Sequence, residues 1–232
     1  MFEDLPVEWA SLNDDIIHCR QCDRLVTWRE TAAATRRRAY RDWVYWGKGV
    51  PGFGDLKARV LIVGLAPGAH GSNRTGRMFT GDASGDFLYA ALHRAGFANQ
   101  PASYARDDGL LLKDIFISAV GRCAPPDNKP TTQELNTCEP FLLREIGLLK
   151  QVEGVVALGR IAFDRLLKIY RWNELPNAST YRFNHGAFYA PVSGRPWLLA
   201  SYHPSRQNTQ TGRLTVGMFD EIWSKVKSML ND

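Results

Sequence analysis

The sequence contains no long hydrophobic stretch. No run of about 18 or more apolar residues occurs in it, so no transmembrane helix is expected. The N-terminal stretch MFEDLPVEWASLNDD is acidic and has no long apolar segment, so it does not resemble a secretory signal. These absences predict a cytoplasmic protein with no membrane partner.

Neither sign of charge dominates the composition. The 29 basic and 24 acidic residues give a net charge of +5, which permits a polyanionic partner without requiring one. Apolar residues make up 44% and charged residues 23% of the chain, which excludes intrinsic disorder as the dominant state. A length of 232 residues fits one ordinary domain, or one domain with a small appendage.

Cysteine is scarce, and the four residues present fall into two pairs. Cys19 and Cys22 are close together, and Cys123 and Cys138 follow about 100 residues later. In a reducing compartment, clustered cysteines more often bind metal or do redox chemistry than form disulfides. Four thiolates suit either zinc or an iron–sulfur cluster, and the spacing does not decide between them. Alternatively, Cys123 and Cys138 are small buried apolar residues.

Short apolar runs alternate with helical patterns from residue 58 onwards. This alternation predicts an α/β fold with a parallel sheet and helices on both faces. Residues 58–232 are expected to form this core, and residues 1–57 a basic, partly helical arm, together one domain over 1–232. The expected strands are 59–65, 115–120, 155–159 and 197–201, and the expected helices are 84–95, 131–149, a segment ending at 169, and 219–230.

Two unusual loops, 64–82 and 201–214, each follow directly on an expected strand. Ligands of parallel sheets bind beyond the carboxyl ends of the strands, so the two loops are predicted to meet at one cleft. The first loop, GLAPGAHGSNRTGRMFTGD, is rich in glycine, which lets its backbone approach a ligand closely. It matches neither the P-loop nor the GxGxxG pattern, so a nucleotide cofactor is not favoured.

That loop, together with SAVGRCAPPDNKPT (118–131) and SYHPSRQNTQTGRLT (201–215), resembles the class B, or fifth-family, uracil-DNA glycosylases. The stretch YWGKGVPGFGD (45–55) and the cysteines fit the same family. The resemblance implies a three-layer α/β/α sandwich around a central four-stranded parallel sheet. It also implies a 4Fe–4S cluster held by Cys19, Cys22, Cys123 and Cys138.

Three residues are the candidates for the chemistry that the resemblance implies. His203 stands where the family has its catalytic histidine, and would stabilise the negative charge on the departing base. Phe79 is the expected stacking surface for a flipped base, or else a core residue. The first motif in this sequence begins Gly-Leu-Ala-Pro at residues 64–67 and has no carboxylate there. Asp82 is therefore the candidate for holding water or stabilising the cationic sugar, and its alternative role is a helix N-cap.

Four more residues are expected to line the substrate site: Gly64, Ala66, Ala119 and Asn208. Ala119 is informative because uracil-strict relatives carry an asparagine at the matching position, which reads the pairing edge of the base. Alanine makes no such hydrogen bonds, and a site without them discriminates less. We therefore expect broad specificity, covering uracil, hypoxanthine and some damaged pyrimidines.

DNA contacts are expected from Ser205 and Arg206, with Leu214 as a wedge that fills the vacated stack or as a core residue. The basic residues of the arm form either a DNA-contacting surface or an ordinary solvated face. They are Arg36, Arg37, Arg38, Arg41 and Lys48.

The sequence thus predicts a monomeric, monofunctional DNA glycosylase acting on single- or double-stranded DNA that contains uracil or other deaminated bases. Neither loop contains lysine, so Schiff-base lyase activity is not expected. The alternatives are a non-catalytic iron–sulfur DNA-binding protein and a strictly uracil-specific class A glycosylase.

Overall fold

The computed structural model describes residues 5–231, and a mixed sheet of six strands lies at its centre. The strands are β1 (Phe53–Gly54), β2 (Val60–Gly64), β3 (Ile115–Ala119), β4 (Gly154–Leu158), β5 (Phe188–Tyr189) and β6 (Trp197–Ser201). Their order in the sheet is β1-β3-β2-β4-β6-β5. The inner strands β3, β2, β4 and β6 run parallel, whereas β1 and β5 pair antiparallel with their neighbours at the two edges.

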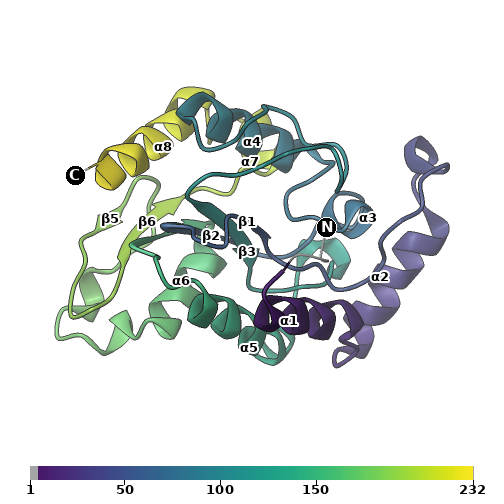
Figure 1. The fold of residues 1–232 in the computed structure, drawn as a ribbon, viewed down its shortest axis with the longest axis horizontal. Coiled ribbons are helices and arrows are strands. Elements are labelled where there is room, and N and C mark those ends of the chain that lie inside the picture. Colours follow the sequence, from purple (N-terminus) through teal and green to yellow (C-terminus); the bar gives the residue numbers. More distant parts are fainter. Residues whose placement is uncertain (1–4, 232) are drawn as a thin grey trace.

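Helices cover both faces of this sheet (Figure 1). They are α1 (Val7–His18), α2 (Asp23–Thr35), α3 (Ser72–Thr75), α4 (Ala83–Ala95), α5 (Thr132–Leu148), α6 (Arg160–Ile169), α7 (Arg206–Gln210) and α8 (Val216–Asn231). Helices α4 and α8 pack on one face, and α1, α5 and α6 lie on the other (Figure 1). Short 3-10 turns occur at Arg38–Tyr40, Pro126–Asn128, Trp172–Glu174 and Ala178–Thr180.

Both faces of the inner strands are buried, which explains their continuous apolar runs. Alternate side chains point to opposite faces of a strand. Ile62 of β2 therefore belongs to the core beneath α4 and α8, and its neighbours Leu61 and Val63 belong to the core beneath α1, α5 and α6. The predicted three-layer α/β/α architecture is confirmed.

The sheet differs from the expected one at its edges. The prediction of four parallel strands omits β1 and β5, each two residues long. Such short strands contain too few residues for an alternating pattern to be recognised.

Local sequence signals predicted the helix ends well. The expected capping box at the start of α5 is present, with the side chains of Thr131 and Glu134 each bonded to the other's backbone. Gly96 ends α4 in the left-handed conformation, at a φ of 86°. Helix α8 begins at Val216, three residues earlier than expected.

The N-terminal segment is packed closely into the fold. Trp9, Leu12 and Ile16 of α1 lie in the core beneath the sheet, and Phe53–Gly54 pairs with β3. Helix α2 projects to one side of the sandwich (Figure 1). The first four residues of the expected arm, and Asp232, lie outside the described residues. Within residues 5–231, no helix is both long and apolar enough to span a bilayer.

Candidate active site

The two loops singled out in the sequence meet in space. Phe79 lies in the loop after β2, and His203 follows the end of β6. Their rings face each other with centroids 5.8 Å apart and planes inclined by 29°. The parallel sheet brings them together because β2 and β6 both end at the same edge, as expected for an α/β site.

Phe79 is held in an unusual backbone conformation. Its φ is 51°, in the left-handed region that L residues seldom adopt, so its surroundings must hold it there. The Ser103 hydroxyl donates to the Phe79 carbonyl at 3.2 Å. Gly64 makes room for the ring, since a Cβ there would lie 2.8 Å from the Cζ of Phe79. The ring of Phe79 thus packs directly on the backbone of Gly64.

His203 is positioned by its own loop. The side-chain amide of Asn208 donates to the His203 carbonyl at 2.9 Å, so Asn208 fixes the turn that carries the imidazole. Burial lowers the pKa of His203 to about 4. At neutral pH the ring is therefore an uncharged imidazole with one N–H donor.

Asp82 performs its expected capping role and also faces the glycine-rich loop. Its Oδ1 accepts hydrogen bonds from the backbone N–H of Ser84 at 3.0 Å and of Gly85 at 3.1 Å, at the start of α4. Its Oδ2 packs against Gly71, where a Cβ would lie only 1.9 Å away. Burial raises the pKa of this carboxyl group, although the two capping bonds oppose the shift.

The remaining substrate candidates lie where β2 and β3 end. Gly64 and Ala119 are paired in register as the last residues of their strands, and Ala119 is buried. Ala66 lies two residues beyond β2, close to Gly121, where a Cβ would approach its methyl group to 3.3 Å. Ala119 therefore lies at the end of β3, next to Gly64, the residue that packs against the Phe79 ring.

The three DNA-contact candidates have different surroundings. The Ser205 hydroxyl caps α7 by accepting from the Asn208 N–H at 3.3 Å, and Arg206 is exposed. Leu214 is 1% exposed and packs in the core beneath α4 and α8. Of its two expected roles, the structure supports the core residue. A wedge must project from the surface, so this burial disfavours the wedge role, which stays a prediction.

Sequence reasoning missed a clasp around the first loop, centred on Arg74. The guanidinium of Arg74 lies between the rings of Tyr40 and Trp43, at 3.9 and 4.1 Å from their centroids. It also donates to the carbonyls of His70 and Gly81. The N-terminal segment therefore braces the glycine-rich loop after β2 directly. An arginine among glycines gives no local signal of such a role.

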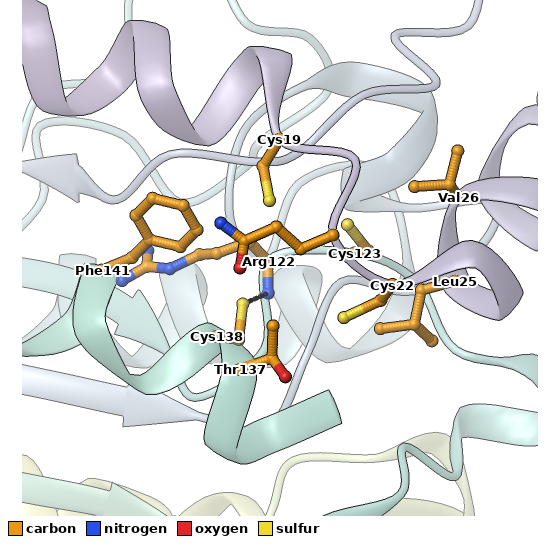
Figure 2. Close-up of a pocket in the computed structure, with 10 residues that line it drawn as sticks. Cys19, Cys22, Leu25, Val26, Arg122, Cys123, Thr137, Cys138 and Phe141 are labelled. Carbon is orange, nitrogen blue, oxygen red and sulfur yellow. Dashed lines mark hydrogen bonds between the residues drawn. The ribbon is translucent and has the colours of Figure 1, made fainter. Parts of the chain in front are cut away.

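All four cysteines line one pocket between α1, α2 and α5 (Figure 2). Cys19 ends α1 and Cys22 precedes α2, while Cys123 follows β3 and Cys138 belongs to α5. Figure 2 shows their sulfur atoms facing a common space. Within residues 5–231, however, no three His, Cys, Asp or Glu side chains are grouped closely enough to form a metal site.

The surroundings of the cysteine pocket bear on whether it suits an anionic metal–sulfur group. Burial raises the pKa of Cys138 to about 12 and also raises that of Cys123, so burial disfavours a free thiolate at both positions. The buried Arg29 donates to the Cys123 sulfur at 2.8 Å, and the Arg122 N–H donates to the Cys138 sulfur at 3.2 Å. Four sulfur atoms and nearby N–H donors are the chemistry that iron–sulfur clusters use, although among the described residues the side chains are not grouped as a metal site.

Comparison with known proteins gives the family. The model of the uracil DNA glycosylase superfamily matches residues 51–227, and the chain belongs to this superfamily. It is 54% identical to a type-5 uracil-DNA glycosylase of Thermus thermophilus, over 91% of this chain and 93% of the relative. Type-5 enzymes of Mycobacterium leprae and Pyrobaculum aerophilum are 51% and 45% identical, over 94% and 89% of this chain and 94% and 87% of their own lengths.

Proposed function

We propose that this protein is a DNA glycosylase that flips uracil out of DNA and hydrolyses its N-glycosidic bond. The family and the type-5 relatives support this activity. The observation that carries it is the contact between Phe79 and His203, which joins an aromatic surface to a hydrogen-bond donor. A base stacked near Phe79 would lie within reach of a group able to stabilise it as it leaves.

His203 would act as a neutral electrostatic catalyst. As the glycosidic bond breaks, negative charge develops on the oxygen of the departing uracil. An N–H donor fixed beside that oxygen lowers the barrier, most strongly where water is excluded. The low pKa of His203 keeps the imidazole uncharged, so it would stabilise the anion through this hydrogen bond.

Asp82 would act on the sugar side of the same bond. One carboxylate oxygen caps α4, and the other faces the loop backbone at Gly71. From this position we propose that Asp82 orients the attacking water or stabilises the positive charge that develops on the sugar. The capping bonds would fix the carboxylate in place, so that little reorganisation is needed during the reaction.

We propose that specificity extends beyond uracil, to hypoxanthine and some damaged pyrimidines. The methyl group of Ala119 stands where an amide could read the pairing edge of the base, and it offers no donor or acceptor. The same reasoning disfavours a strict class A enzyme. Because neither loop contains lysine, the product would be free base and an intact abasic site.

The four cysteines are proposed to hold a 4Fe–4S cluster. When bound, the group would supply a rigid link between α1, α2, α5 and the β3–α5 loop. The pocket's sulfur donors and nearby N–H groups support this. Helix α2 lies beside the sandwich rather than within it. A cluster bound at this point would anchor α2, and with it Tyr40 and Trp43, which contact Arg74.

The proposed partner is uracil-containing DNA, single- or double-stranded, bound by a cytoplasmic monomer. Ser205 and the exposed Arg206 would contact phosphates beside His203. The exposed Arg36, Arg37 and Arg38 of the N-terminal segment are proposed as a further set of phosphate contacts.

The direct test is release of free uracil from an oligonucleotide with one central uracil. The wild type should release the base and leave an alkali-sensitive site without cutting the strand. The His203→Ala variant should lose roughly 100- to 1,000-fold in rate because a transition-state donor is removed. The matched control is His93→Ala, an exposed histidine of α4, which should keep full activity. A wild type that binds the DNA but releases no base would favour the non-catalytic alternative.

A further inference from the structure

Arg29 of α2 is a buried cation that makes no direct ion pair with any described carboxylate. Its side chain is 1% exposed, among the largest fully buried ones. It donates to the Cys123 sulfur at 2.8 Å and to the Cys19 carbonyl at 2.9 Å. Its Nε is buried with no hydrogen-bond partner. Within residues 5–231, no ion pair joins it to Asp or Glu, and the adjacent Glu30 pairs with Arg20 instead.

Of the other three buried arginines, two are balanced by a carboxylate, and the third, Arg74, lies between the rings of Tyr40 and Trp43. Arg77 forms a two-pronged ion pair with Asp108, and Arg122 forms one with Glu145. Burial of an unpaired guanidinium is costly, because water no longer solvates it and nothing replaces that solvation. Among residues 5–231, the only side chain that accepts a hydrogen bond from Arg29 is that of Cys123, through its sulfur. A neutral thiol is a weak acceptor and does not offset the charge.

We propose that Arg29 is the counter-charge for the anionic metal–sulfur group of the four-cysteine pocket, where it raises the reduction potential and helps to retain the iron. This inference rests on the proposed cluster. Four thiolates and bridging sulfides outweigh the charge of the irons, so the group is negative, and more so when reduced. A buried cation beside Cys123 stabilises the reduced form most.

The role is one of positioning and electrostatics, separate from base excision. The Arg29 carbonyl, not its side chain, accepts the hydrogen bond from the side-chain amide of Asn73 in the active-site loop, at 3.1 Å. Replacing the side chain leaves that hydrogen bond in place. The potential and the iron content therefore report on the proposal more directly than activity does.

The experiment uses the full chain, purified without oxygen, as wild type, Arg29→Gln, Arg29→Lys and Arg20→Gln. Iron and sulfide content, the midpoint potential and the rate of iron release to a chelator are measured for each. Arg29→Gln should show a lower midpoint potential and retain iron roughly 10- to 100-fold less well, as when an outer-shell partner is removed. Arg29→Lys should stay near the wild type, because it keeps the charge.

Arg20→Gln is the matched control. Arg20 follows Cys19 directly, but its side chain is 63% exposed, so water already screens its charge and the potential should not change. An iron-loaded Arg29→Gln with the wild-type potential and iron retention would overturn this inference alone. If Arg29→Gln holds no iron, Arg29→Lys decides: iron content near the wild type supports the inference, and content as low as in Arg29→Gln overturns it. A wild type without iron and sulfide would overturn the cluster and this inference together, leaving uracil release as an independent test of function.

Discussion

The imidazole of His203 faces the ring of Phe79 at a centroid distance of 5.8 Å. This contact brings together the two loops that the sequence singles out. One ring comes from a loop after β2 and the other from a loop after β6. Gly64 supports the first ring and Asn208 the turn that carries the second. Substitutions around this contact separate the catalytic roles from the structural ones.

Asp82 has two roles that one pair of variants separates. Asn is as good an N-cap as Asp, so Asp82→Asn should keep the stability of α4 while lowering uracil release at least about tenfold, because the charge is removed. Asp82→Ala should lose the same activity and also about 0.5–2 kcal/mol of unfolding free energy. Rates and urea unfolding curves of both variants test this. Full activity in Asp82→Asn would leave Asp82 as a cap only.

His203 should make stability depend on acidity. Its pKa is about 4 in the folded protein, whereas an exposed histidine has a pKa of about 6.5. Between these values the unfolded chain binds the proton more tightly, so stability present above about pH 6.5 is lost as the pH falls toward 4. The loss between pH 7.5 and 5 should be on the order of 1–2 kcal/mol, and His203→Gln should lack it. The free energy of unfolding is measured with urea at a series of pH values for both proteins. The same pH dependence in the wild type and in His203→Gln would contradict the lowered pKa of His203.

Ala119 should control the choice of base. Ala119→Asn introduces an amide beside Gly64, at the ends of β3 and β2, and should raise the ratio of uracil to hypoxanthine release about tenfold or more. Ala119→Leu is the matched control, since leucine has the same branched shape as asparagine without its hydrogen-bonding groups. Single-turnover rates on both lesions give the ratio. An equal change in both variants would attribute the effect to crowding.

The buried ion pair of Glu145 and Arg122 should be essential to stability. Glu145 is fully buried and also accepts hydrogen bonds from the Ser118 hydroxyl and the Gly52 N–H. Glu145→Gln should cost about 3–5 kcal/mol, because it leaves Arg122 as an uncompensated buried cation. The control Glu153→Gln breaks a more exposed pair with Arg59 and should cost at most about 1 kcal/mol. Thermal unfolding of both variants makes the comparison, and equal losses would argue against the role of burial.

The basic segment should contribute to DNA affinity without selecting the base. Replacing the exposed Arg36, Arg37 and Arg38 by Gln should weaken binding to all DNA alike. The slope of log affinity against log salt should become shallower by up to about 0.9 for each phosphate that is no longer neutralised. Lys57→Gln serves as the control, because the exposed Lys57 precedes the start of β2, whereas the glycine-rich loop follows its end. A salt slope equal to that of the wild type would show that this face is merely solvated.

The sequence by itself determined the inner strands, the long helices and the cysteine and loop motifs. These features follow from apolar periodicity, caps such as Thr131, and residue types that are close together in the chain. Only the tertiary structure decided that Leu214 is a core residue, that Arg74 is clasped by Tyr40 and Trp43, and that Arg29 lies unbalanced beside Cys123. Each of these depends on contacts between distant segments and on how a buried charge is compensated, and both arise only when the sheet brings those segments together.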